Sequence, residues 1–373
     1  MAYSNHDQDS FFGIRNYNIN QSSFYSSLIY NTILGSTLNK IKFGFNYSYD
    51  DFDEVVDKKN IFYSRIDKSF GGFFEYSYDS MDAVSLVAGI RYDVHNNLGD
   101  FFTPRLHMRY QPFEKSVMRF SVGTGRKSSN IFSENQNIFA TGRDIQILNK
   151  SGKFYGLDSE KAINYGFSFR QGFFINNREG DITFDYYVTD FKNQVVVDWE
   201  TQGELSFYNL NGKSFAKSLQ IDFEYQISDN VLIKSTFKNF DVKKQYVSGF
   251  KQNPLTPKNR FFTNIEASTN ERENGSKWKF DLTYNWIGTQ RLTSHTELVD
   301  FGGYSPSYSL LNSQITREFS NKLEVYIGGE NIGGYTQSNP IIGGDPFGAD
   351  FDTSLIYAPI HGALFYLGLR LKL

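Results

Sequence analysis

Apolar and polar side chains alternate with a period of two along most of this chain. From Lys277 to Asn285 the even positions are apolar or aromatic, and the odd positions are polar or charged. Successive side chains of a β-strand point to opposite faces, so such a segment has one apolar and one polar face. About fifteen segments fit this strand pattern, and helical spacing explains almost none of them. Clear examples begin at Ile41, Val84, Ile182 and Leu219.

The connections between these segments alternate in length. Short connections rich in Asn, Asp, Ser and Gly, typical of hairpin turns, fall at Ser36–Thr37, Asp79–Asp82, Phe113–Lys115, Asn176–Glu179, Asp229–Asn230 and Ser320–Asn321. Long connections fall at Asp51–Asp67, Arg126–Ser159, Lys244–Asn259, Arg291–Ser307 and Gln337–Ile360. Short turns at one end and long loops at the other are typical of outer-membrane β-barrels, whereas a β-sandwich gives no reason for this segregation.

The composition suits such a barrel. Aromatic residues make up 17% of the chain, which favours strands, and the mean hydropathy of −0.46 is that of a polar chain. No run of about 18 apolar residues is present, which excludes a transmembrane helix but allows a barrel with polar inward side chains. The net charge of −3 gives no basic excess for nucleic acid, and without cysteine no disulfide or thiolate metal site can form.

The two ends of the chain carry separate expectations. The first residues, Met1 to Asp7, lack the basic and apolar regions of a signal peptide, so we expect either a removed signal or a piece of a longer protein. The last segment, His361 to Leu373, ends on an apolar residue in strand register. That ending is expected of a strand that closes a barrel.

These patterns together predict an all-β fold, a transmembrane antiparallel β-barrel in the cell outer membrane, surrounded by outer-membrane lipid. Lipid cannot satisfy an open strand edge, so the spanning strands must close. Aromatic residues near strand ends would form the girdles at the two membrane interfaces. The inner face would carry mixed charges, which include Arg91, Asp93, Arg105, Arg119, Asp222 and Glu224.

Several short stretches resemble the barrel of TonB-dependent outer-membrane receptors, in the form found in Bacteroidetes. They follow the family's order over most of the chain, at 71–76 (GGFFEY), 88–93 (AGIRYD), 103–106 (TPRL), 119–126 (RFSVGTGR), 159–166 (SEKAINYG), 328–332 (GGENI) and 358–362 (APIHG). Each motif is weak alone, and their ordered succession is what indicates the family.

The resemblance implies a barrel of about 22 strands with a plugged lumen, and import of a scarce nutrient powered by TonB. Since only about fifteen strands are counted and nothing resembles the plug, residues 1–373 are expected to be the carboxy-terminal part of such a barrel, without a plug domain. The expected partners are the plug and first strands, missing here or supplied in trans. TonB would act through that plug.

The candidate ligand-binding residues lie in the long connections. Arg126, Glu134 and Arg143 belong to one connection and Arg291 to another. Arginine suits the carboxylate or phosphate groups of a chelate, and loops often carry function. The alternative is that these side chains pack on neighbouring parts of the loops. On the inner face, the charged residues are expected to contact the plug or solvate the lumen.

The sequence offers little support for a metal site or an enzyme active site. Asp345, Asp350 and Asp352 could supply oxygen ligands to Ca²⁺, but EF-hand spacing is absent and a solvated loop with Asx turns is the simpler interpretation. Gly212-Lys213-Ser214 resembles the end of a P-loop, yet Phe207 stands where that motif needs glycine. No metalloprotease or nucleophile-elbow motif occurs. We therefore predict neither an enzyme activity nor a cofactor.

The leading functional hypothesis is a receptor that imports an iron chelate, cobalamin or a similar large solute with energy from TonB. The alternative is a passive or structural barrel, a pore or anchor that works without TonB. A plug encoded upstream or supplied in trans would favour the first, and conductance without energy input would favour the second. An outer-membrane enzyme would need a nucleophile and a base near one rim.

Overall fold

The computed structural model describes residues 1–57, 59–80, 83–148, 151–293, 302–319, 323–348 and 350–371. Its long strands are β1 (Ala2–Phe12), β2 (Arg15–Leu34), β3 (Ser36–Val56), β4 (Ile61–Asp79), β5 (Val84–His95), β7 (Arg105–Phe113), β8 (Ser116–Lys127), β10 (Glu160–Ile175), β11 (Arg178–Asn193), β14 (Ser214–Ser228), β15 (Val231–Tyr246), β17 (Asn259–Ser268), β18 (Lys277–Ile287), β19 (Tyr308–Glu318), β20 (Leu323–Glu330) and β21 (Leu364–Leu371). Shorter elements lie in the connections: β6 (Gly99–Phe102), η1 (Ser133–Phe139), β9 (Asp144–Ile147), β12 (Val195–Asp198), β13 (Glu204–Asn209) and β16 (Gly249–Gln252).

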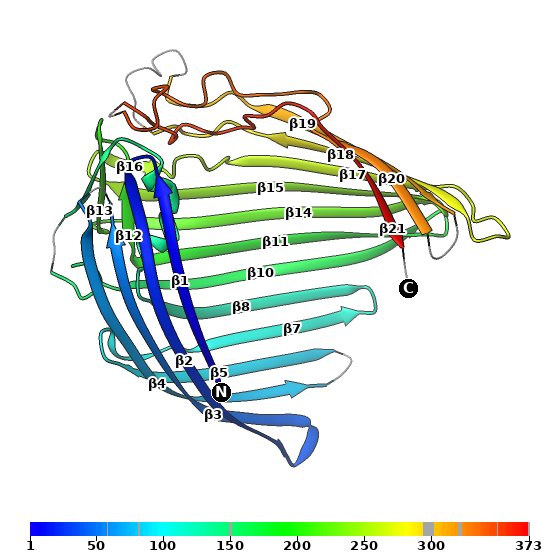
Figure 1. The fold of residues 1–373 in the computed structure, drawn as a ribbon. Coiled ribbons are helices and arrows are strands. Elements are labelled where there is room, and N and C mark those ends of the chain that lie inside the picture. Colours follow the sequence, from blue (N-terminus) through cyan, green and yellow to red (C-terminus); the bar gives the residue numbers. More distant parts are fainter. Residues whose placement is uncertain are drawn as a thin grey trace.

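The long strands form one curved antiparallel wall (Figure 1). The sheet has 18 strands, but β6 and β7 both pair with β5, and β16 and β17 both pair with β15, so sixteen strand positions follow one another around the wall. In the described ranges β1 pairs with β2 alone and β21 with β20 alone. The prediction of an antiparallel barrel fold with about fifteen strands is therefore confirmed, and the wall is open between β1 and β21.

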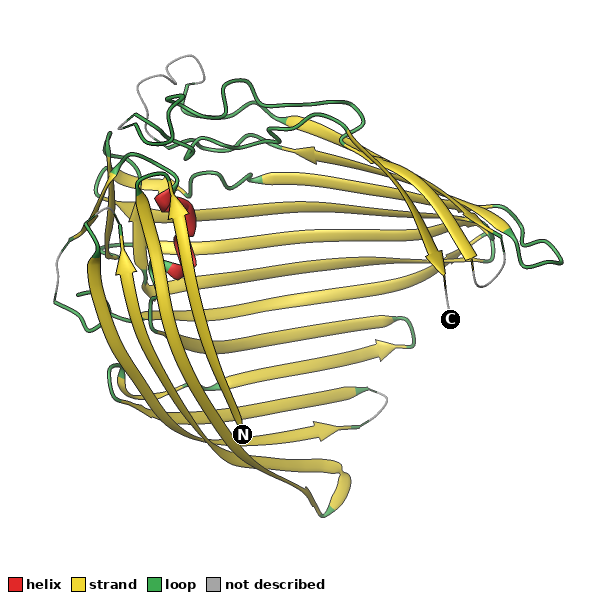
Figure 2. Ribbon diagram, in the orientation of Figure 1, coloured by secondary structure: helices red, strands yellow, loops and turns green. Residues whose placement is uncertain are grey.

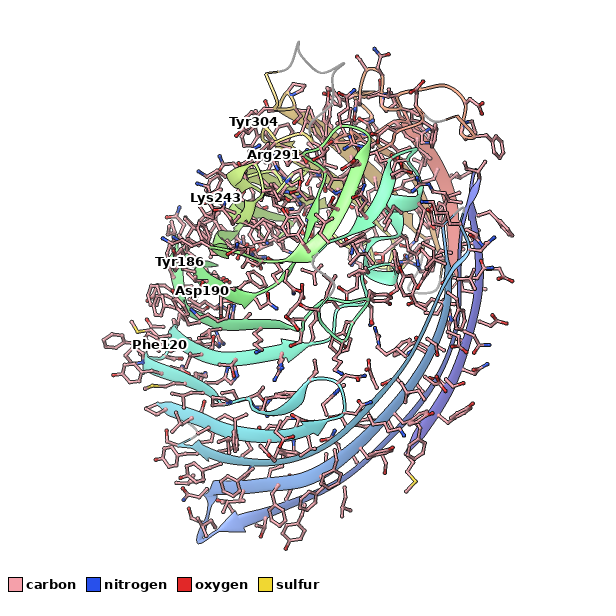
Figure 3. All side chains as sticks on the ribbon, turned by 90° about the vertical axis from the view of Figure 1, so that its left-hand side faces the viewer. Phe120, Tyr186, Asp190, Lys243, Arg291 and Tyr304 are labelled. Atoms are coloured by element: carbon pink, nitrogen blue, oxygen red, sulfur yellow. The ribbon has the colours of Figure 1, made fainter. Side chains whose placement is uncertain are left out.

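The two faces of the wall differ in polarity as the alternation predicted. Phe184, Ile221 and Phe237 are cross-strand neighbours on the outer face, whereas Asp185 and Gln220 are neighbours on the inner face. Phe120 and Tyr186 point away from the concave side (Figure 3). Many large apolar side chains of this outer face, such as Phe184 and Phe223, are exposed, and in a membrane hydrocarbon lies against this face.

Short turns join the strands at one end of the wall. Asn176 and Asn177 both adopt positive φ angles, 51° and 59°, which is the backbone of a type I′ hairpin turn and explains why asparagine occupies both positions. Gly35, at a φ of 75°, makes the turn between β2 and β3. The predicted turn at Ser320–Asn321 lies outside the described residues, as does Leu373. No helix among the described residues is long and apolar enough to cross a membrane.

The predicted long connections are partly wrong. Asp51–Asp67 is mostly strand, because β3 runs to Val56 and β4 resumes at Ile61. These residues continue the hairpin beyond the spanning segment, and their mixture of charged and aromatic side chains hid the strand pattern. Conversely, residues 194–213, which contain β12 and β13, form a long connection that the sequence pattern does not indicate. In the described part of the chain the helix η1 is the one helical element, and it lies on the concave side of the wall (Figure 2).

Candidate functional site

Three long connections pack together at the loop end of the wall. We call their described residues, within 128–159, 194–213 and 331–363, the loop cap. Strand β9 of the first connection pairs in parallel with β13 of the second, and β13 pairs antiparallel with β12. Backbone hydrogen bonds continue into the third connection, where the Gly142 N–H donates to the Phe351 carbonyl. The loops therefore form one ordered unit.

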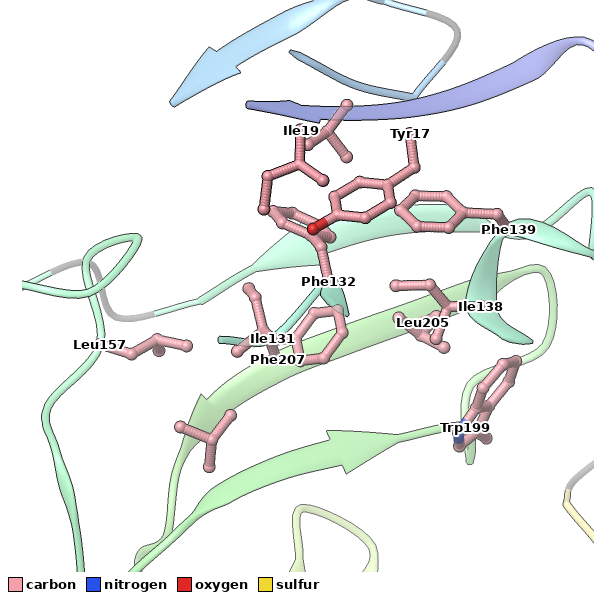
Figure 4. Packing of buried hydrophobic residues seen from close by; sticks show 12 residues of the cluster. Tyr17, Ile19, Ile131, Phe132, Ile138, Phe139, Leu157, Trp199, Leu205 and Phe207 are labelled. Atoms are coloured by element: carbon pink, nitrogen blue, oxygen red, sulfur yellow. The ribbon is translucent and has the colours of Figure 1, made fainter. Parts of the chain in front are cut away.

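The cap has a hydrophobic core of its own (Figure 4). Because strand side chains alternate, Leu205 and Phe207 face a cluster that contains Phe132 and Phe139. Tyr17 of the wall stacks on Phe139 with ring centroids 5.4 Å apart, which joins the core to β2. Aromatic contacts of this kind add to the free energy gained by burying the rings. The full set of buried members is Tyr17, Ile19, Val56, Ile131, Phe132, Ile138, Phe139, Leu157, Val195, Trp199, Leu205 and Phe207.

A buried ion pair ties the first connection to the third. The Arg143 Nε lies 2.7 Å from an Asp352 carboxylate oxygen, and both side chains are at most 5% exposed. Arg143 also donates to the Trp199 carbonyl, at 2.9 Å, in the second connection. One guanidinium therefore joins all three segments of the cap. Removing either partner of such a pair leaves the other charge buried without an ion-pair partner.

A second cluster of charged side chains links the connections that follow β11, β15 and β18. Glu200 accepts hydrogen bonds from Arg291 and Lys251, each at 2.7 Å. The Arg291 guanidinium also lies over the Tyr246 ring, 5.3 Å from its centroid. Burial alone would raise the pKa of Glu200, but the hydrogen bonds and charges of Lys251 and Arg291 outweigh it and hold that pKa below its ordinary value.

The four predicted ligand-binding residues therefore differ in burial: two are buried and two are partly exposed. Arg143 and Arg291 are buried and bind other parts of the chain. Arg126 is half-buried, donates to the Ser159 hydroxyl at 3.0 Å and lies over the Phe101 ring. Glu134 is partly exposed and accepts from Lys127 at 2.8 Å. The alternative of packing between loops describes Arg143 and Arg291, while ligand binding by Arg126 and Glu134 stays a prediction.

The three aspartates proposed for Ca²⁺ are not brought together. Asp352 forms an ion pair with Arg143. The Asp345 carboxylate accepts a hydrogen bond from the Phe347 N–H at 2.9 Å, as in an Asx turn. Among the described residues, no group of three or more His, Asp and Glu side chains is close enough to hold a metal ion. The structure therefore gives no support to a metal site formed by Asp345, Asp350 and Asp352.

The six predicted inner-face residues do lie on the concave face by strand register. Arg91 contacts Asp93 through two hydrogen bonds of 2.7 and 2.5 Å, and the pair lies against Gly71, where any side chain would collide with it. Arg105 pairs with Glu75 on β4. The rest of the set are Arg119, Asp222 and Glu224, of which Asp222 accepts from Gln220 and Thr236. Contact with a plug stays a prediction.

One feature of the inner face is not indicated by the sequence pattern. A pocket of 460 Å³ lies where β15, β17, β18 and β19 approach the cap, and Lys238, Arg260, Phe262, Tyr308 and Tyr357 are among its lining residues. Lys238 and Arg260 both occupy polar positions of their strands. Their meeting was not visible in the sequence because the register of two strands decides it.

The fold and this site define a class of protein. A strand wall with an apolar outside, charges inside, short turns at one end and packed loops at the other is the architecture of an outer-membrane β-barrel.

Comparison with known proteins then gives the family. Residues 2–332 match the family model described as "TonB dependent receptor-like, beta-barrel". The chain therefore belongs to the TonB-dependent receptor family, whose members are outer-membrane β-barrel receptors and not enzymes. Its assignment to the Bacteroidetes form of the family stays a prediction.

Known relatives are distant in sequence. The ferric enterobactin receptor PirA of Pseudomonas aeruginosa is 22% identical over 242 residues, which are 59% of this chain and 28% of that protein. A solved variant of the ferric enterobactin receptor PfeA of Pseudomonas aeruginosa, bound to enterobactin, gives a TM-score of 0.68 at 14% identity over 95% of this chain and 55% of its own. The copper transporter OprC gives a TM-score of 0.71 at 11% identity, over 99% of this chain and 61% of its own. The chain thus spans about half the length of the solved structures it resembles.

Proposed function

We propose that this chain supplies the carboxy-terminal wall and the loop cap of a receptor that imports a large, scarce solute with energy from TonB. An iron chelate, cobalamin or a solute of similar size is the proposed cargo. The observation that carries the proposal is the combination of a charged concave wall with an ordered cap at its loop end. A passive pore has no need for loops that pack around a core of their own.

The proposal includes partners for the two free strand edges and for the concave face. β1 and β21 each have one strand neighbour in the described ranges, and lipid does not tolerate an unpaired edge. Further strands of the receptor would pair with these edges. A plug would contact the mixed charges of the inner wall, such as the pairs Arg91–Asp93 and Arg105–Glu75, and would carry the pull of TonB.

The second candidate function is a passive or structural barrel. The open lumen-facing pockets along the inner wall favour it, because they leave room for water beside the charges. Such a barrel would conduct ions in a planar bilayer without an energy source.

Uptake of a labelled ferric chelate or of cobalamin into cells that express the receptor containing this chain separates the two. We expect accumulation that stops when TonB is deleted or the proton gradient is collapsed. Uptake that continues without TonB, together with steady bilayer conductance, would favour the passive barrel. A variant in which residues 128–148 are replaced by a short Gly-Ser linker should reduce binding of the solute at the cell surface while the barrel remains in the membrane.

A further inference from the structure

The turn that follows β5 is held by the ring of His95, the last residue of that strand. Its Nδ1 atom accepts hydrogen bonds from the backbone N–H groups of Asn97, at 3.1 Å, and Leu98, at 3.2 Å. A ring nitrogen accepts only while it carries no proton, and a protonated imidazole donates from both nitrogens. The ordinary pKa of histidine is about 6.5, so this turn depends on a group that changes its charge near neutral pH.

The same turn is bonded to β4. The Asn97 side-chain amide donates to the Asp67 carboxylate at 2.7 Å and to the Ile66 carbonyl at 2.9 Å. Asp67 is buried, and its other carboxylate oxygen lies 3.0 Å from the Arg65 Nε. One buried carboxylate therefore links the turn of His95 to Arg65.

Arg65 in turn holds the first connection of the loop cap against the wall. Its guanidinium donates to the Asn130 side chain. It also lies over the rings of Phe154 and Tyr155, 5.2 and 5.4 Å from their centroids. A guanidinium is planar, so it makes these contacts together only in one orientation, and the pairing with Asp67 fixes that orientation.

Charged groups face the His95 ring from three strands. Asp67 and Arg65 lie on β4, Asp93 lies on β5 and Arg126 lies on β8. Burial lowers the pKa of His95, and the two arginines lower it further against the opposing effect of the two carboxylates. A protonated His95 would lose both backbone hydrogen bonds and would compete with Arg65 for the Asp67 carboxylate.

We propose that His95 makes the attachment of the loop cap to the wall sensitive to acid. With a neutral ring the turn is closed, Asp67 orients Arg65, and the first connection is held on β4. A proton taken up from water breaks the bonds to Nδ1, opens the turn and draws Asp67 away from Arg65. Because the folded pKa is lowered, the stabilisation is full above the ordinary pKa of about 6.5 and is lost as the pH falls below it. This switch does not depend on which solute the receptor imports.

Hydrogen exchange of the backbone amides in 151–157 tests the switch in the whole receptor in outer-membrane vesicles. Exchange is followed from about pH 8 to about pH 5, a range that includes the titration of histidine, and is corrected for the intrinsic effect of pH on exchange. We expect protection of 151–157 and of the turn 96–98 to fall about fivefold or more below pH 6.5, while β10 and β11 stay unchanged. Protection of 151–157 that is constant over this range would overturn the proposal.

His95→Asn is the matched variant, because an asparagine side chain also accepts backbone N–H groups in a turn but does not titrate. Protection of 151–157 should then stay high at every pH. His107→Asn removes an exposed histidine of β7 and should keep the wild-type profile. A wild-type response to acid in His95→Asn would show that another group titrates and would overturn the proposal.

Arg65→Gln separates the turn from the cap. This variant keeps the titrating ring but loses the contacts with Phe154 and Tyr155. The turn 96–98 should still respond to acid, whereas 151–157 should exchange fast at every pH. A response of 151–157 that survives this substitution would contradict the route through Arg65, and it can be measured even if His95→Asn does not reach the membrane.

Discussion

The wall and the loop cap of this chain place their side chains in opposite ways. On the wall, large apolar side chains such as Phe45 and Leu367 are 51% and 75% exposed on the outside, and charges face inward. In the cap, Phe132 and Phe139 are 2% and 1% exposed and pack against one another. The charge of Arg143 is buried with its partner inside the cap.

This difference reflects the surroundings of each region. Outer-membrane hydrocarbon takes the place of a protein core for the wall, so its strands need no apolar partner inside. The cap lies at the loop end of the wall, and its segments are held together by apolar area that they bury against one another, by strand pairing and by a buried ion pair. The two regions therefore depend on different terms of the folding free energy.

Arg143→Ala should lower the stability of the cap and leave the stability of the wall unchanged. It removes one partner of a buried ion pair and leaves Asp352 buried without its charge partner, so we expect the cap to lose about 3–5 kcal/mol of stability against local opening. Hydrogen exchange of the backbone amides in 128–148 and 194–213 measures the effect. Unchanged protection of those amides, or equal loss in β10 and β11, would contradict a cap that folds separately.

Phe184→Arg should destabilise the wall in the membrane without a direct effect on the packing of the cap. Phe184 is 37% exposed on the outer face of β11, where an arginine near the bilayer midplane costs about 2–4 kcal/mol. The matched control is Gln220→Arg on β14, which lies on the inner face beside Asp185 and Asp222. The fraction of folded, protease-resistant protein in the outer membrane should fall for the first variant and stay near wild type for the second. Similar losses in both would mean that the face assignment is wrong.

Acid should loosen the Glu200 cluster before it affects the wall. The pKa of Glu200 is held below its ordinary value, so its contribution to stability is full above the unfolded pKa of about 4.3 and is lost as pH falls through the folded pKa. Proteolysis of residues 194–213 at decreasing pH follows the change. Glu200→Gln should remove this dependence on pH. A variant that keeps the wild-type profile would show that another group titrates.

Lys192→Ala should have the smallest effect. Lys192 and Asp190 form an ion pair of 2.5 Å on the outer side of β11, but their side chains are 55% and 45% exposed. Exposed pairs of this kind contribute about 0–1 kcal/mol because water and salt screen them. Hydrogen exchange in β11 should match wild type within that limit. A loss as large as that of Arg143→Ala would remove the distinction between buried and exposed pairs.

The wall could be predicted from the sequence to a large extent, and the cap could not. Strand alternation and turn residues such as Asn176 are local, so each can be recognised without knowing what lies nearby in space. The prediction failed where the strands extend to the cap, as at Asp51–Asp67, because charged and aromatic side chains are mixed there and Val56 packs into the cap core. The motif around Arg91 and Asp93 indicated the family correctly, although the close contact of that pair with Gly71 follows from the pairing of β4 with β5.

The roles of the site residues depended on contacts between distant parts of the chain. Arg143 was placed in the right loop, but its partner Asp352 lies 209 positions away and was assigned to a different kind of site. Lys238 and Arg260 were not recognised as a pair, since their opposition follows from the register between β15 and β17.

The spanning strands, their two faces and the family can be recognised from the amino-acid sequence, because they follow from a period of two and from short local motifs. Which loops pack into a cap, which charges form buried ion pairs and which charges line a pocket follow from the three-dimensional fold. Those outcomes depend on burial and on pairing between segments far apart in the chain, and no local pattern encodes either of them.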